Sequence, residues 1–156
     1  MSISHLIDDY AAGPALLRQA VAGMTRELLL ARPIAGKWST HECVCHIADF
    51  EPVYVDRMTR VIAQEQPTYF GGDPDLYAAK LSYSARDVEE ELNLIEACRA
   101  HMARILRSLP ESAFQRTGNH SEAGQQTLEK LLTNVTRHIP HHIEFIREKR
   151  QALGVV

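Results

Sequence analysis

The chain has 156 residues and a formal net charge of −3, and 45% of its residues are hydrophobic. This length and composition suit a single globular domain, residues 1–156, without a linker. The negative charge and the lack of a long Lys/Arg run argue against nucleic acid as a partner. No apolar stretch reaches the roughly 20 residues of a membrane-spanning helix, so no membrane association is expected.

The first residues and the cysteines bear on the compartment. The amino-terminal sequence MSISHLIDDYAAG lacks the basic start and the apolar run of a signal peptide. The three cysteines, Cys43, Cys45 and Cys98, are odd in number, and the Cys-Val-Cys spacing suits no ordinary disulfide framework. We therefore expect a cytoplasmic protein.

Helical periodicity marks the first two segments. The first runs over about residues 4–31, and Gly13-Pro14 is expected to kink or split it. The second covers about residues 39–65 and begins with Ser-Thr-His-Glu, which has the form of a capping box. The short link between them predicts antiparallel neighbours.

Two further helices are predicted. The third follows the capping residues Ser84 and Asp87 and ends at Leu109, before a proline. The fourth starts near residues 124–127 and ends at about Leu153, with Pro140 inside it. No segment alternates well enough to be a strand, so the predicted fold class is all-α, a four-helix bundle.

The positions of the histidines in the second and fourth helices predict the topology. His46 lies about seven residues from the start of its helix and His142 about eleven from the end of its own, or roughly 10 and 16 Å. These depths match only if the two helices are antiparallel. The long connection over residues 66–83 permits this, because it can cross the bundle. We predict an up-down-down-up bundle with this crossover between the second and third helices.

Three histidines fall on the apolar stripes of these helices. His138 and His142 are one turn apart on the fourth helix, and His46 lies on the inner face of the second. Buried imidazoles need partners for both ring nitrogens, and a divalent metal ion binds neutral imidazole readily. His46 alone would more often be a core or capping residue, but the His-x-x-x-His pair favours a metal site formed by all three.

Other side chains compete for this role. Cys43 and Cys45 lie on either side of His46 around the helix and are possible soft ligands, but buried apolar cysteine is the commoner arrangement. The segment of residues 118–124 contains His120 and Glu122, either of which is a candidate acid or base, although a loop-capping segment would look the same. Five histidines are expected to be exposed or to surround the ligands, and Asp49 and Glu51 are expected to face solvent. These histidines are His5, His41, His101, His120 and His141.

Three protein ligands leave a coordination position open, which is typical of catalytic rather than structural zinc sites. A water or thiol bound there loses its proton more readily and becomes a nucleophile at neutral pH. Imidazole suits zinc, nickel, iron and cobalt, so the ligand type does not choose the metal.

Short motifs in a fixed order resemble the DinB-like, or YfiT-like, metal-binding four-helix bundles over essentially the whole chain. They are Gly-Lys-Trp-Ser at 36–39, His-Ile-Ala-Asp at 46–49, Thr-Leu at 127–128 and His-Ile-Pro-His-His at 138–142. The resemblance implies the crossover topology, metal ligands at His46, His138 and His142, nickel or zinc as the metal, and a homodimer. It also implies kinship with transferases and isomerases that use a low-molecular-weight thiol.

Three functions compete on this evidence. The first is a metal-dependent enzyme that activates a small thiol for transfer to an electrophile or for isomerisation. The second is a non-catalytic, metal-binding stress-response bundle. The third is a structural dimer whose histidines are satisfied core groups.

Overall fold

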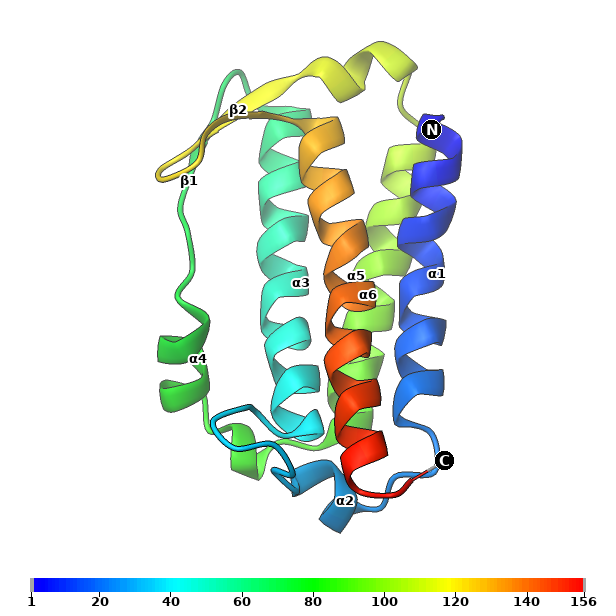
Figure 1. The fold of residues 1–156 in the computed structure, drawn as a ribbon. Coiled ribbons are helices and arrows are strands. Elements are labelled where there is room, and N and C mark those ends of the chain that lie inside the picture. Colours follow the sequence, from blue (N-terminus) through cyan, green and yellow to red (C-terminus); the bar gives the residue numbers. More distant parts are fainter. Residues whose placement is uncertain (1, 156) are drawn as a thin grey trace.

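A computed structural model of the chain describes residues 2–155, and four long helices dominate it (Figure 1). They are α1 (Ile3–Val21), α3 (Thr40–Ala63), α5 (Val88–Arg107) and α6 (Leu128–Ala152). Two short helices, α2 (Arg26–Leu30) and α4 (Pro74–Lys80), and two 3-10 turns, Tyr83–Ala85 and Glu111–Gln115, lie in the connections. The predicted four-helix bundle is therefore present. Within residues 2–155, no helix is both long and apolar enough to span a membrane.

A small sheet departs from the all-α prediction. Strands β1 (Thr68–Tyr69) and β2 (Thr117–His120) are parallel, and β2 forms an antiparallel hairpin with β3 (Gly124–Thr127). Strands of two to four residues are too short for an alternating pattern to show in the sequence. Gly118 lets the sheet approach α3, because a Cβ there would lie 2.9 Å from the Val61 side chain. The sheet thus packs beside the end of α3.

The first predicted helix is divided, but not at Gly13-Pro14. α1 continues through that pair and ends at Val21, and Gly23 adopts a left-handed φ of +75° before Thr25 caps α2. A proline at position 14 has no N–H to donate to the carbonyl of Tyr10, four residues earlier. That carbonyl instead accepts a hydrogen bond from Arg99 at 2.9 Å, so the helix continues.

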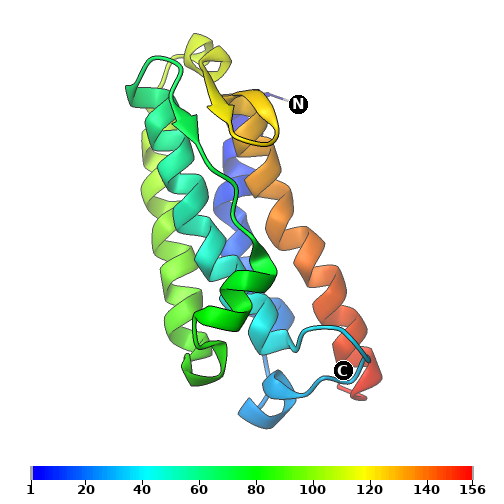
Figure 2. The ribbon, with the colours of Figure 1, turned by 90° about the vertical axis from the view of Figure 1, so that its left-hand side faces the viewer.

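The helix directions follow from contacts at their ends. Arg107 near the end of α5 pairs with Asp8 near the start of α1 at 2.8 Å, so these helices are antiparallel. Arg150 near the end of α6 donates to the carbonyl of Ala22, just beyond the end of α1, so these two are parallel. Figures 1 and 2 show α3 and α5 running opposite to α1 and α6. The segment between α3 and α5, which carries α4, descends along the outside of the bundle.

A buried ion pair joins all four long helices. Arg99 of α5 and Glu51 of α3 are both fully buried, and the guanidinium donates twice to Glu51 Oε1, at 2.6 and 2.9 Å. The same guanidinium donates to the carbonyls of Tyr10 in α1 and Val135 in α6. The expectation that Glu51 faces solvent is therefore wrong. Its carboxylate is held in the interior because Arg99 supplies charge and hydrogen bonds there.

Candidate metal centre

The capping box predicted at the start of α3 is present and fixes the position of His46. Ser39 Oγ accepts a hydrogen bond from the Glu42 amide at 3.1 Å, and the Glu42 carboxylate accepts from the Ser39 amide at 2.8 Å. Arg32 pairs with the same carboxylate and ties the preceding loop to the helix. His46 lies two turns further along and is only 6% exposed.

The other two histidines come from the middle of α6. Thr127 caps this helix by accepting from the Lys130 amide, and His138 and His142 follow on one face, four residues apart. Pro140 lies between them without interrupting the helix. Because α3 and α6 are antiparallel neighbours, this face of α6 meets the inner face of α3.

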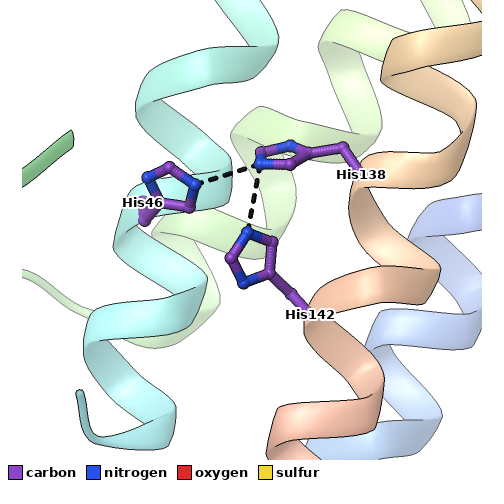
Figure 3. Close-up of side chains that lie close together, drawn as sticks. All are labelled: His46, His138 and His142. Carbon is purple, nitrogen blue, oxygen red and sulfur yellow. Dashed lines mark hydrogen bonds between the residues drawn. The ribbon is translucent and has the colours of Figure 1, made fainter. Parts of the chain in front are cut away.

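The three imidazoles point toward one another (Figure 3). His138 Nε2 lies 3.0 Å from His46 Nε2 and 3.2 Å from His142 Nε2. One possible ligand nitrogen from each ring lies within 4.8 Å of those from the other two. The structure thus brings together the three residues that the sequence predicted as ligands.

Burial keeps all three rings in the neutral form. Removal from water lowers the pKa of His46 to about 4, although Asp49 and Asp75 oppose the shift. Burial, with the neighbouring histidines, lowers the pKa of His138 to about 2 and that of His142 to about 3. Neutral imidazole is the form that binds metal ions, so near neutral pH no proton has to leave before a metal binds.

The hydrogen-bonding capacity of the rings indicates whether a metal ion fits. In its ring plane, a neutral imidazole nitrogen has either one hydrogen or one lone pair, so His138 Nε2 cannot form a good hydrogen bond with both nitrogens facing it. The Nδ1 atoms of all three rings are buried and have no hydrogen-bond partner among the described residues. If each Nδ1 carries the hydrogen, three Nε2 lone pairs converge on one point. This donor set fits a divalent metal ion.

Aromatic side chains surround the histidines. The His46 ring lies 5.2 Å from Trp38 and 4.8 Å from Phe50, measured between ring centroids. Tyr54 approaches His138, and Phe145 approaches His142. These rings exclude water, and electrostatic interactions are stronger where water is excluded.

A cavity of about 270 Å³ adjoins the site on the side of His142. It lies between the loop that precedes α3 and the last turns of α6. Ile34, Trp38 and Phe145 form apolar walls, and His142 and Lys149 contribute polar groups from α6. The volume is close to the lower end of the range for small-molecule sites. A small ligand in this cavity would lie against one of the three histidines.

The predicted acid or base candidates lie elsewhere. His120 is the last residue of β2. Its Nδ1 accepts hydrogen bonds from the backbone amides of Glu122 and Ala123 at 3.1 and 3.2 Å, and these bonds close the hairpin turn. The Glu122 side chain is exposed beside Gly71. Neither belongs to the histidine group, and their role as acid or base stays a prediction.

The cysteines near the site are buried and have high pKa values. Burial raises the pKa of Cys43, although Lys149 opposes the shift, and raises that of Cys45 to about 12. Neither cysteine belongs to the histidine group. Cys45 Sγ instead lies 3.6 Å from Nε2 of His41, a buried ring that also contacts the carbonyl of Tyr83. His41 thus anchors the 3-10 turn that follows α4.

Near the site, the sequence predicted the wrong environment for Asp49 and did not single out Lys149. Asp49 was expected to face solvent, but it is half-buried and accepts hydrogen bonds from Tyr83 and Arg86 at 2.7 and 2.8 Å. Lys149 belongs to a charged run and is nevertheless 3% exposed. The spacing of His142, Phe145 and Lys149, three and then four residues, was the available signal, since it places all three on one helix face.

Comparison with known proteins agrees with this architecture. The family model of the DinB superfamily matches residues 9–146. A protein of Oceanobacillus iheyensis named "Putative metal-dependent hydrolase" is 27% identical over 144 residues, which cover 92% of this chain and 83% of the relative. YfiT of Bacillus subtilis, which bears the same description, is 28% identical over 142 residues, covering 90% and 80% of the two chains.

A solved structure shares the whole fold. The structure of YfiT from Bacillus subtilis is described as a probable metal-dependent hydrolase with an unusual four-helix bundle topology. The two structures superimpose with a TM-score of 0.92, and their sequences are 26% identical. The aligned region covers 100% of this chain and 91% of the YfiT chain. The likeness therefore includes the long helices and the connections between them.

Proposed function

We propose that this protein, which belongs to the DinB superfamily, is an enzyme that uses a divalent metal ion held by His46, His138 and His142 to activate a nucleophile. The observation that carries the proposal is the convergence of three neutral imidazoles whose Nε2 atoms cannot satisfy one another. Relatives named "Putative metal-dependent hydrolase" agree with a metal-dependent activity. Nickel and zinc are the metals we expect.

The nucleophile is either water or a small thiol. A divalent ion bound by three imidazoles lowers the pKa of a water in an open coordination position and deprotonates a thiol there. Water would make the protein a hydrolase, as the relatives are named. Hydrolysis is faster when a side chain accepts a proton from the attacking water. The two carboxylates that line the cavity, Asp75 and Glu148, are the candidates for this role, and both are exposed.

One observation favours the thiol as a second candidate. Among residues 2–155 the potential metal-binding group contains only the three histidines, and no carboxylate joins them as a base. A thiol that the metal ion deprotonates does not require such a base. We therefore propose transfer of a low-molecular-weight thiol to an electrophile, or thiol-dependent isomerisation, as the alternative to hydrolysis.

Metal analysis tests the first part of this proposal. The protein is purified without an affinity tag and analysed for bound metal, beside His46→Ala, His138→Ala and the control variant His101→Ala, whose histidine is exposed. We expect about one metal ion per chain in the parent and in the control, and loss of most metal in the other two. A parent protein that takes up no divalent metal would contradict the proposal.

Cobalt substitution then separates the reactions. The visible spectrum of the cobalt form reports the coordination of the ion, so a shift on adding glutathione or another small thiol supports thiol chemistry. A spectrum that ignores thiols, together with turnover of ester or amide substrates, supports hydrolysis. A metal-stabilised protein that gives neither a thiol response nor turnover would instead be the non-catalytic metal-binding bundle.

A further inference from the structure

Lys149 is a buried cation in the wall of the cavity beside His142. Its side chain is 3% exposed, and both Lys149 and Cys43 line the cavity. Lys149 Nζ lies 3.7 Å from Cys43 Sγ and donates to the Phe145 carbonyl at 3.1 Å. The charged end of the side chain therefore lies at the cavity wall and points back along α6 toward the histidines.

The charge of Lys149 has no carboxylate partner. Among the described residues, none of the ion pairs includes Lys149, and its two hydrogen-bond contacts use two of the three ammonium hydrogens. Nζ also lies 5.8 Å from the centre of the Phe145 ring, which carries no countercharge. A buried charge is costly unless it is paired. An anionic group in the cavity would supply both the countercharge and the missing hydrogen-bond acceptor.

The rest of the cavity limits which anion fits. Trp38, Ile34 and Phe145 form apolar walls, which suit a hydrocarbon or aromatic body. Three exposed charges, Lys37, Asp75 and Glu148, lie at the rim, and two of them are acidic. The acidic pair disfavours a dianion such as a phosphate monoester, whereas a single carboxylate needs only the one buried cation.

We infer that this cavity is the substrate pocket and that Lys149 binds the carboxylate of a small, largely apolar monocarboxylate. The inference rests on the proposed function, because it places the reacting part of the substrate beside His142. Lys149 is seven residues from His142, about 10 Å of helix rise, but its Nζ reaches back to the Phe145 carbonyl, and both residues line the same cavity. One small molecule can therefore contact Lys149 and reach the histidine group. Lys149 is thus a substrate-positioning residue that selects for charge.

Trp38 provides a direct measurement of binding. It is the only tryptophan of the chain, it lines the cavity, and its ring lies 5.2 Å from that of His46. The metal-loaded protein is titrated with phenylacetate while tryptophan fluorescence is recorded. Phenylacetamide has the same shape without the charge, and benzylphosphonate, at a pH above its second ionisation, carries a second charge. We expect phenylacetate to bind more tightly than either of them.

The variants assign this preference to Lys149. Lys149→Met removes the charge at similar length, and we expect phenylacetate to bind about tenfold more weakly or worse. Lys149→Arg keeps a cation and should retain most of the affinity. Lys130→Met, at an exposed position of the same helix, is the matched control and should bind like the parent. The midpoint of thermal unfolding of Lys149→Met should be unchanged or higher, because an unpaired buried charge has been removed.

Several results would overturn the inference. Equal affinity for phenylacetate in the parent and in Lys149→Met would overturn it. Equal affinity for phenylacetate and phenylacetamide in the parent would also overturn it, and that comparison requires no variant. Binding that persists in Lys149→Met but disappears when the metal is chelated would assign the carboxylate to the metal. Failure of the proposed function is seen separately as absence of bound metal, and in that case the titration still reports on Lys149 in the metal-free protein.

Discussion

Two polar clusters lie in the core of the same bundle, and the chain satisfies them to different degrees. Arg99 donates hydrogen bonds to groups on each of the other three long helices, so its charge and geometry are fixed from within. Among the described residues, only the second oxygen of its partner Glu51 lacks a hydrogen bond in this ion pair. The three histidines face one another through their Nε2 atoms, which cannot all be satisfied by hydrogen bonds within the group. The first cluster acts as an internal clamp, whereas the second is incomplete until something binds.

This contrast separates stability from function. A buried ion pair costs free energy when either member is removed, because the other charge is left unpaired. The histidine group instead lacks good partners for its Nε2 atoms in the metal-free state, and a metal ion bound there would supply them and stabilise the fold. The two clusters should therefore respond oppositely to truncation, and this difference can be measured.

The largest effect is expected at the clamp. Arg99→Met leaves the Glu51 carboxyl buried without its partner, and breaking such a pair costs about 3–5 kcal/mol. We expect urea unfolding to show a loss of this order in the metal-free protein. Adding Glu51→Leu to Arg99→Met should recover much of the loss, since both charges are then absent. A single variant as stable as the parent would mean that Arg99 is not a clamp.

Metal binding should produce the next largest effect. A ligand that binds only the folded state stabilises it by about 2.7 kcal/mol at one hundred times its dissociation constant. The midpoint of thermal unfolding should rise accordingly when Ni²⁺ or Zn²⁺ is added to the metal-free protein. His138→Ala should show little change with the same metals. An equal rise in His138→Ala would show that the ion binds somewhere other than the histidine group.

The clamp also explains a glycine inside a helix. Gly13 lies in α1, where alanine would normally be more stable by about 1 kcal/mol. A Cβ at this position would lie 2.2 Å from Arg99 Nη1 and 3.2 Å from the Ile139 side chain. Gly13→Ala should therefore destabilise the protein, by about 1–3 kcal/mol as in other overpacked cores. Ala12→Gly, at the exposed neighbouring position, provides the propensity baseline in the same urea experiment.

The sequence predicted the histidine group better than it predicted the clamp. Histidines at three- and four-residue spacing on apolar stripes are conspicuous, because imidazole is an unusual core residue. Glu51 and Arg99 are charged types that are almost never fully buried unless paired. Their pairing joins residues 48 positions apart, which no local pattern reveals. The interaction that centres the bundle was therefore not visible in the sequence.

The helix boundaries and the small sheet show the same limit. The capping box at Ser39 and the cap at Asp87 are local signals, and both are present in the structure. Pro14 looks like a break in the sequence because its missing hydrogen bond can be counted locally. The compensating donor, Arg99, comes from another helix. Likewise, β1 forms only by pairing with a strand about 50 residues later, so its two residues carry no pattern of their own.

The smallest expected effect is at the centre of the histidine group. His138→Leu replaces a half-buried imidazole, whose buried Nδ1 lacks a partner, with an apolar side chain of similar size. At pH 7 we expect the metal-free variant to be as stable as the metal-free parent, or about 1 kcal/mol more stable. The sign is opposite to that expected for Arg99→Met, although both changes remove a buried polar group.

Acid should increase the difference between parent and variant. In the unfolded chain histidine takes up a proton below about pH 6.5. In the fold, burial lowers the pKa of His46 to about 4 and that of His138 to about 2. The unfolded state therefore binds more protons between these values, and the metal-free parent loses stability as pH falls from 6.5 toward 4. His138→Leu lacks one of the three groups and should lose stability less steeply. If the urea midpoints of the two proteins fall equally as the pH is lowered over this range, His138 does not resist protonation in the fold.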